Sequence, residues 1–117
     1  MTYNNIEKVS NIVLKLLNNE TYIHHAGRRT GKTTLAISVA KTLITYGKRI
    51  TFVNKTNNMI ALTMSSFDSI MRKHIKFIIL PSSNYNKIAG YKSDIFIFDE
   101  IYPNPHFYAS CAYFYSE

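Results

Sequence analysis

The segment Ala26-Gly27-Arg28-Arg29-Thr30-Gly31-Lys32-Thr33-Thr34 determines how the rest of this sequence is interpreted. Its spacing is that of a phosphate-binding loop, with Ala26 in place of the pattern's usual first glycine. In such a loop, backbone N–H groups surround the β-phosphate of a nucleotide, and Gly31 lets the backbone approach it. Lys32 would reach the β- and γ-phosphates, and the Thr33 hydroxyl would bind Mg²⁺. All nine residues are therefore candidate nucleotide-binding residues.

The residues on either side of this loop have the character that the motif requires. Thr21–His25 is rich in residues that favour β-strands, and the apolar segment Thr34–Ile44 is typical of a buried helix. The sequence therefore predicts a strand, a loop and a helix whose N-terminus completes the anion site.

A second motif, Ile95-Phe96-Ile97-Phe98-Asp99-Glu100, places two carboxylates directly after four apolar residues. The apolar run is typical of a strand buried on both faces of a parallel sheet. The carboxylates would then lie at the edge of the sheet where α/β proteins bind ligands. Asp99 would hold Mg²⁺, commonly through water, and Glu100 would act as general base toward the attacking water. The alternative is a buried strand that ends in a solvated acidic turn.

The composition fits one small domain with a basic surface. The 117 residues are 46% hydrophobic, and 14 basic against 7 acidic residues give a net charge of +7. This charge suits a polyanion such as nucleic acid, although nucleotide binding and solubility tolerate it too, and the basic residues are scattered. Cys111 is the only cysteine, which excludes an internal disulfide and favours a reducing compartment.

Neither a secretory signal nor a membrane span is expected. The N-terminus lacks a basic segment followed by an apolar stretch, and no apolar run approaches the roughly 18 residues of a membrane-spanning helix. We therefore expect a soluble, intracellular protein.

His24 and His25 are neighbours in the predicted first strand, so their side chains would point to opposite faces and make a poor joint metal site.

The rest of the sequence alternates between helical and strand patterns, which predicts one α/β domain with a mostly parallel sheet and right-handed connections. The predicted elements are an N-terminal helix within residues 1–19, strands at 48–54, 76–80 and 95–98, a helix at 56–73, and a polar loop at 81–93. Gly47 is a C-cap candidate for the helix before it. Within the aromatic C-terminal segment 103–117, residues 106–117 are compatible with a helix, and their aromatic side chains are predicted to pack in the core rather than stack on bases.

The Asp99-Glu100 pair is similar to that of the P-loop ATPases that place a catalytic glutamate beside the Mg²⁺ aspartate. Within that branch, Gly27–Thr34 resembles the ATPase domain of viral terminase large subunits, the motors that package DNA into capsids. The polar turn Val53–Thr56 and the segment Gly90–Asp94 before the acidic strand also fit this family. The resemblance covers about residues 20–102.

This resemblance implies a P-loop NTPase fold, a three-layer sandwich around a mostly parallel sheet, with ATP and Mg²⁺ bound. It makes Lys32 and Glu100 catalytic residues. It makes Thr33 and Asp99 the metal ligands. Terminases also carry a loop arginine that senses or stabilises the γ-phosphate, and Arg28 or Arg29 would play that part here. The resemblance further implies double-stranded DNA, a homo-oligomeric ring, a portal or capsid partner, and a location in the host cell during virus assembly.

The sequence departs from this family after the acidic strand. A terminase ATPase domain has a further strand, with a Ser/Thr-containing coupling motif, between the loop strand and the acidic strand, and a nuclease domain normally follows. Residues 103–117 show neither feature. We therefore expect a sheet that is incomplete at the C-terminus, with a gap beside its most buried strand. A fragment, a split gene product or a partner that completes the sheet would each account for such a gap.

Four functions remain open at this point. A terminase-type ATPase would couple ATP hydrolysis, by in-line attack of water on the γ-phosphate, to DNA translocation. A helicase-like ATPase shares both motifs but needs further helicase motifs and a second core domain. An inactive nucleotide-binding module that assembles with another protein would fit an incomplete sheet and an aromatic tail. A small-molecule kinase is the weakest alternative, because such enzymes usually lack the glutamate after the Mg²⁺ aspartate and carry an arginine-rich lid.

Overall fold

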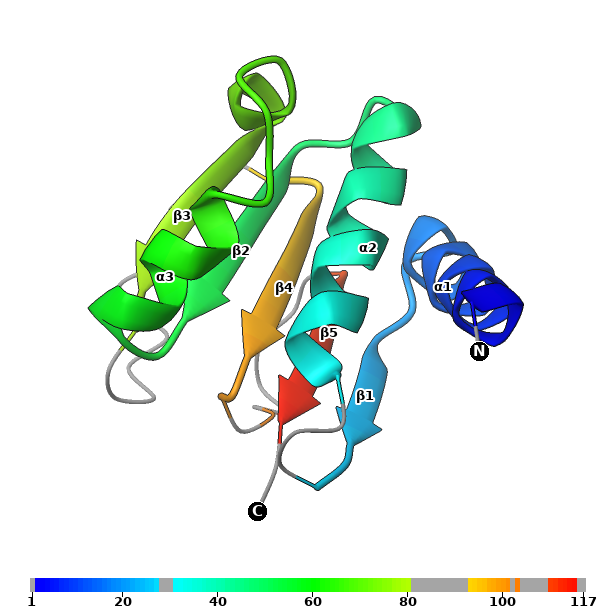
Figure 1. The fold of residues 1–117 in the computed structure, drawn as a ribbon. Helices are drawn as coiled ribbons and strands as arrows, with labels where there is room; N and C mark the ends of the chain where they lie inside the picture. The colour runs from blue at the N-terminus through cyan, green and yellow to red at the C-terminus, as the bar shows by residue number, and fades with distance from the viewer. Residues whose placement is uncertain (1, 28–30, 81–92, 102, 104–109, 116–117) are drawn as a thin grey trace.

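Five parallel strands form one sheet whose spatial order differs from their order along the chain. The computed structural model describes residues 2–27, 31–80, 93–101, 103 and 110–115, with side chains from Ile6 onward. The strands are arranged β1-β5-β4-β2-β3, and every neighbouring pair is parallel (Figure 1). Their bounds are β1 (Tyr22–His25), β2 (Ile50–Asn54), β3 (Ile75–Ile79), β4 (Ile95–Asp99) and β5 (Cys111–Tyr115). The predicted α/β class with a parallel sheet is confirmed.

Three α-helices lie on one face of this sheet (Figure 1). α1 (Thr2–Leu17) packs against α2 and β1, α2 (Lys32–Thr45) crosses the central strands, and α3 (Asn57–Met64) packs against β2 and β3. The connections through α2 and through α3 are both right-handed, as predicted from the twist of the strands. No helix covers the opposite face among the described residues, so the second helical layer of a three-layer sandwich is not seen there. Within the same ranges, no helix has the length and apolar character to cross a bilayer.

α2 packs closely on the centre of the sheet because its inner face combines small and branched side chains. Ala36, Val39, Ala40 and Leu43 recur at helical spacing, and all four are fully buried. The helix ends at Thr45 with Tyr46 as its C-cap, so Gly47, the predicted C-cap, lies one residue beyond the cap; its φ of 79° is the left-handed conformation that glycine adopts without strain. This packing fixes the N-terminus of α2 relative to the ends of the central strands.

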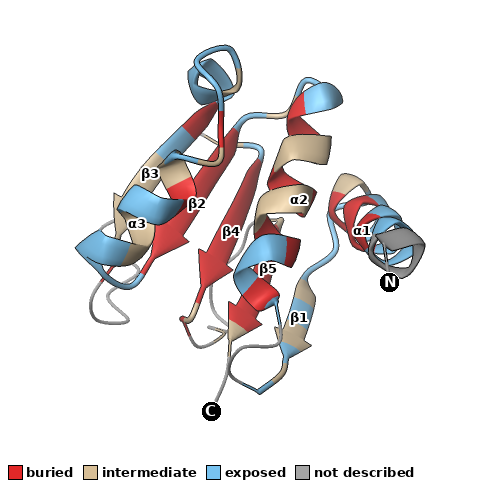
Figure 2. Cartoon of the chain, viewed as in Figure 1, coloured by how far each residue is buried: buried red, intermediate tan, exposed pale blue. Residues whose placement is uncertain are grey.

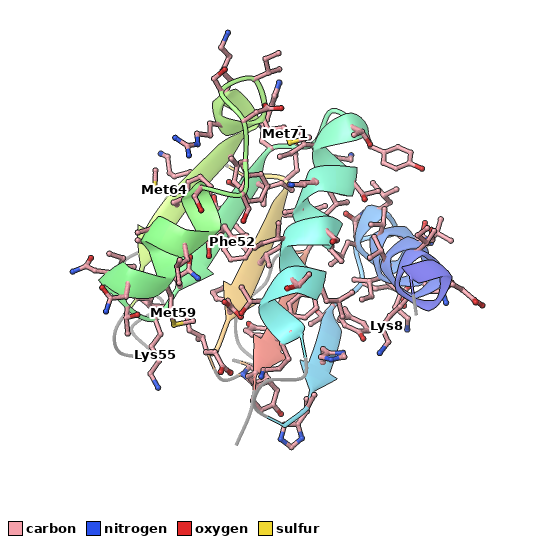
Figure 3. The ribbon with its side chains drawn as sticks, in the orientation of Figure 1. Lys8, Phe52, Lys55, Met59, Met64 and Met71 are labelled. Carbon is pink, nitrogen blue, oxygen red and sulfur yellow. The ribbon has the colours of Figure 1, made fainter. Side chains whose placement is uncertain are left out.

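The three central strands β2, β4 and β5 are buried on both faces, as Figure 2 shows. Their side chains alternate between the two faces. Phe52, at the centre of the sheet (Figure 3), and Phe114 belong to the cluster under the helices. Phe98 and Tyr113 belong to a second cluster on the opposite face, where their rings stack 4.6 Å apart. The prediction that C-terminal aromatic residues pack in the core is confirmed for Tyr113 and Phe114, whereas Phe107 and Tyr108 lie outside the described residues.

The segment Cys111–Tyr115 is a strand, so its interpretation as part of a helix is wrong. β5 pairs with β1 on one side and with β4 on the other. The expected gap between the loop strand and the acidic strand is therefore also wrong, because β5 fills it. The physical reason is the pattern of burial: four of its five residues are buried, alternating between the two core clusters, which favours a central strand over a helix.

The helix predicted at residues 56–73 is correct only for its first half. The Thr56 hydroxyl accepts a backbone N–H of the first turn and caps α3, as a residue of this type does at an N-terminus. After Met64 the chain leaves the helix, and the Asp68 carboxylate accepts the N–H of Met71 at 2.8 Å. Met71 is the first residue of a separate 3₁₀ helix, η1 (Met71–His74), whose N-cap residue is Ile70. Local side-chain hydrogen bonds thus divide an apolar pattern that looks continuous in sequence.

Replacing Phe114 with Ala should reduce the free energy of unfolding by about 3–5 kcal/mol, because it removes a fully buried aromatic side chain. Urea unfolding of the two proteins would measure the loss. Leu62→Ala serves as the control, since Leu62 is 72% exposed and its truncation should change stability by less than about 0.5 kcal/mol. Equal effects of the two substitutions would contradict a central position for β5.

Candidate functional site

The predicted phosphate-binding loop joins the carboxyl end of β1 to the N-terminus of α2 (Figure 1). Gly31, directly before the helix, has a φ of 81°, a conformation that favours glycine. A Cβ atom at Gly31 would meet nothing within 4 Å, so the space beside it is open. Ala26 does not have a positive φ, so its position does not require the glycine of the usual pattern. Arg28, Arg29 and Thr30 lie outside the described residues.

The N-terminus of α2 offers backbone donors to a ligand. The first N–H groups of a helix have no acceptor within the helix, and no side chain caps this one. Thr33 and Thr34, in the first turn, are both exposed. The aligned peptide dipoles add partial positive charge at the same end. Uncapped donors and a positive field together suit an anion such as a phosphate group.

Lys32 connects the loop to the acidic motif. Its Nζ atom donates a hydrogen bond to the carbonyl oxygen of Gly27 at 3.0 Å and lies 3.9 Å from Oε2 of Glu100. The side chain is only 5% exposed, which is unusual for lysine unless its charge has partners. The positive charge of Lys32 is therefore held between the start of the loop and the end of β4.

The two predicted metal ligands also meet. Oγ1 of Thr33 donates to the Asp99 carboxylate, 3.0 Å from Oδ2 and 3.3 Å from Oδ1, although the two residues are 66 positions apart. Asp99 is fully buried at the end of β4, whereas Thr33 is exposed. Hydroxyl and carboxylate oxygens are hard ligands of the kind that Mg²⁺ prefers. No cluster of three or more His, Cys, Asp or Glu that could hold a metal occurs among the described residues, so further ligands would come from water or phosphate.

The negative charge of Asp99 is only partly compensated by its surroundings. Its pKa is raised from 3.8 to about 6, chiefly because burial disfavours the charged form. The nearby Glu100 charge raises it further, while the Thr33 hydrogen bond and the Lys32 charge oppose the shift. A carboxylate with so high a pKa lacks full compensation for its negative charge. A divalent cation would supply that compensation, so these residues fit a bound Mg²⁺.

Glu100 occupies a strained turn at the end of β4. Its φ is 59°, a left-handed conformation that costs a residue with a side chain on the order of 1 kcal/mol. The turn is held by β5, because the N–H of Glu100 donates to the carbonyl oxygen of Phe114 at 2.7 Å. The Glu100 side chain is 29% exposed, so water can reach its carboxylate. Strain that neighbouring structure maintains is common where a side chain must be aimed at a ligand.

Sequence reasoning did not identify Asn54 as a site residue. It is the last residue of β2 and is fully buried, and its amide nitrogen lies 3.4 Å from Oδ2 of Asp99. The signal that could have found it is positional: a polar residue ends an apolar strand at the same edge of the sheet as the acidic motif.

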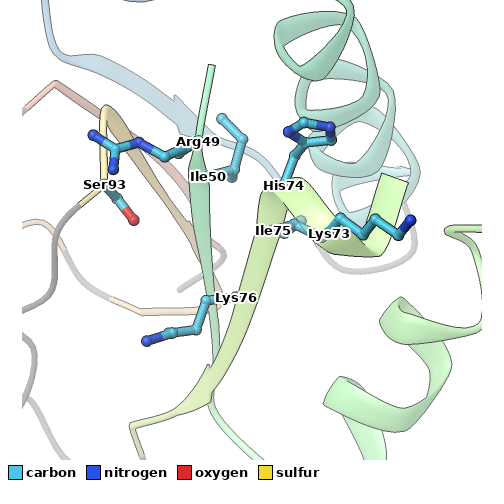
Figure 4. A pocket seen from close by; sticks show the side chains of 7 residues that line it. All are labelled: Arg49, Ile50, Lys73, His74, Ile75, Lys76 and Ser93. Carbon is cyan, nitrogen blue, oxygen red and sulfur yellow. The ribbon is translucent and has the colours of Figure 1, made fainter. Parts of the chain in front are cut away.

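A hollow of about 170 Å³ lies at the opposite edge of the sheet, beside the first residues of β2 and β3 (Figure 4). Its basic side chains point in different directions rather than toward one ligand, and Nε of Arg49 already lies 3.6 Å from Asp94. The hollow is lined by Arg49, Ile50, Lys73, His74, Ile75, Lys76 and Ser93. The edge that carries the loop and the acidic motif is therefore the better candidate site.

Comparisons of the chain with protein-family models, with curated proteins and with solved structures find no match. Interpretation of the site therefore depends on its residues and their geometry.

Asp99→Asn should stabilise the nucleotide-free protein at about pH 7.5 but not near pH 4. Because the pKa of Asp99 is higher in the folded protein, its contribution to stability is complete below its ordinary pKa of 3.8 and is lost as the pH rises through about 6. The ionised carboxylate should then cost about 3 kcal/mol, which a neutral amide avoids. Urea unfolding at both pH values would measure the difference.

Asp94→Asn provides a control of opposite sign. The backbone N–H of Arg49 lowers the pKa of Asp94, so that carboxylate stabilises the fold at neutral pH and loses this effect in acid. A stability difference for Asp99→Asn that does not change with pH would contradict the burial of its charge.

Proposed function

We propose that this chain binds a nucleoside triphosphate, by default ATP, together with Mg²⁺, and hydrolyses it. The observation that carries the proposal is the hydrogen bond from Thr33 to Asp99, formed beside Lys32 and Glu100. Two motifs far apart in the sequence thus contribute a hydroxyl, an ammonium and two carboxylates to one edge of the sheet. This set contains the groups that triphosphate hydrolysis requires.

The chain's own groups account for binding of the triphosphate. The uncapped N–H groups of α2 would receive phosphate oxygens, because they lie beside the open space at Gly31. The Lys32 ammonium, which now donates to the Gly27 carbonyl, would instead donate to oxygens of the β- and γ-phosphates. Thr33 and Asp99 would hold Mg²⁺, which neutralises charge on the phosphate oxygens.

Glu100 would act in the chemical step. Its carboxylate would accept a proton from a water molecule as the water oxygen attacks the γ-phosphorus in line with the leaving group. The bond from the γ-phosphorus to the bridging oxygen breaks, and the nucleoside diphosphate leaves with that oxygen. Partial exposure of Glu100 allows water to enter, and the turn held by Phe114 fixes the backbone from which the carboxylate extends.

We further propose that hydrolysis is coupled to movement along double-stranded DNA, as in a terminase-type motor. The resemblance of the loop to that family supports this, and so does β5, which takes the position where terminases have an additional strand. The net charge of +7 is compatible with a polyanionic partner. In this proposal Arg28 or Arg29 acts on the γ-phosphate, and the chain works in a ring with a portal or capsid partner.

The first test is ATP hydrolysis by the purified chain with Mg²⁺, with and without double-stranded DNA. The wild-type chain should show turnover that increases when DNA is added. Lys32→Ala should abolish nucleotide binding or weaken it strongly, because it removes a buried positive charge directed at the phosphates. Lys48→Ala is a control for the loss of one positive charge, because Lys48 is only partly buried and lies just after the end of α2 that is farthest from the loop. Equal nucleotide affinity of Lys32→Ala and wild type would contradict the proposal that this loop binds phosphate.

Glu100→Gln should separate binding from hydrolysis. The amide has nearly the same shape as the carboxylate but cannot accept the proton, so ATP should bind with roughly unchanged affinity while turnover falls by about 10²-fold or more. Fluorescence of a labelled ATP analogue and release of phosphate measure the two quantities. Hydrolysis at the wild-type rate would remove Glu100 from the mechanism. Binding without turnover in the wild-type chain itself would favour a nucleotide-binding module over a motor.

A further inference from the structure

Asn54 forms a hydrogen-bonded connection between the candidate metal site and α3. Its Nδ2 atom donates to Oδ2 of Asp99 at 3.4 Å and to Oγ1 of Thr63 at 3.3 Å. The Thr63 hydroxyl in turn donates to the carbonyl oxygen of Met59, one turn earlier on α3, at 2.8 Å. Asn54, Thr63 and Asp99 are all buried, so solvent does not compete for these bonds.

A purely structural role explains Asn54 poorly. Among the described residues, its Oδ1 atom is buried and has no hydrogen-bond donor within reach. An unsatisfied buried acceptor typically costs about 1–3 kcal/mol. An apolar residue would avoid this cost at the end of a strand whose neighbours Phe52 and Val53 are apolar and fully buried. The hydrogen bond to Asp99 therefore explains a polar side chain at this position better than packing does.

We propose that Asn54 is a positioning residue for the metal site, which orients the Asp99 carboxylate and ties it to α3. Thr33 approaches the carboxylate from α2, and Asn54 approaches the same Oδ2 atom from β2. Two donors from different elements restrict rotation of the carboxylate, which leaves its remaining lone pairs directed at a cation. This role rests on the nucleotide and Mg²⁺ site proposed above.

Asn54→Leu tests the proposal, because leucine has nearly the same size but no donor. The readout is binding of a fluorescent ATP analogue in EDTA and then across a Mg²⁺ titration. Affinity in EDTA should stay close to that of the wild-type chain, since the loop and Lys32 are unchanged. The Mg²⁺ midpoint, the Mg²⁺ concentration that produces half of the change in binding of the ATP analogue, should rise by about 10-fold. A rise of this size is typical when a residue that orients a metal ligand is removed.

Thr51→Val is the matched control. Thr51 is also fully buried on β2, and its hydroxyl bonds to the Ser93 hydroxyl rather than to any site residue. The Thr51→Val variant should lose stability, as other substitutions of buried polar residues do. Its Mg²⁺ midpoint should equal that of the wild-type chain. An equal shift for Thr51→Val and Asn54→Leu would overturn the proposal, and so would a wild-type midpoint for Asn54→Leu.

Thr63→Val keeps the proposal testable if Asn54→Leu does not fold. It removes the hydroxyl that holds the Asn54 amide but leaves Asn54 in place, so a smaller rise in the same Mg²⁺ midpoint is expected. No rise would overturn the role of the connection to α3. Failure of the proposed function would be distinguishable from failure of the Asn54 proposal. In that case the wild-type chain would show no Lys32-dependent binding of the ATP analogue even in EDTA, and the proposed role of Asn54 would be wrong as well.

Discussion

The Asp99 carboxylate has no access to solvent, and its hydrogen bonds come from α2 through Thr33 and from β2 through Asn54. Burying such a group is costly unless neighbouring elements compensate its charge. Much of the fold serves this end: α2 packs its small side chains on the sheet and thereby brings Thr33 within reach. Compensation is still incomplete, as the raised pKa of Asp99 indicates, and in the function proposed above a bound cation would supply the remainder.

Much of this arrangement could be predicted from the sequence, because it depends on local patterns. Gly31 and Lys32 belong to a motif whose geometry requires a strand before it and a helix after it, and both are present. The apolar run before Asp99 indicates a strand buried on both faces. Since parallel strands end at the same edge of a sheet, the meeting of the loop with the acidic motif follows from these elements.

Other features depend on contacts between distant residues, which a local pattern does not contain. The run Cys111–Tyr115 is apolar with no period, so only its pairing with β1 and β4 distinguishes a central strand from a helix. The left-handed turn at Glu100 is set by a carbonyl group on β5, and glutamate itself does not favour it. Asn54 resembles an ordinary strand-ending residue until the neighbouring strand is known. Each of these errors and omissions concerns how strands lie beside one another.

The position of β5 gives the chain an unusual order of assembly. β5 is the last described strand in sequence, yet it lies between β1 and β4, and its partners in β1 precede it by 90 residues. During synthesis the first four strands leave the ribosome before the strand that must enter between two of them. Pairing over so long a separation is slow, because a large loop must close first. Until β5 is made, the backbone groups of β1 and β4 that pair with it have no strand partner. Unpaired strand edges of this kind are where a nascent chain can bind a chaperone or aggregate.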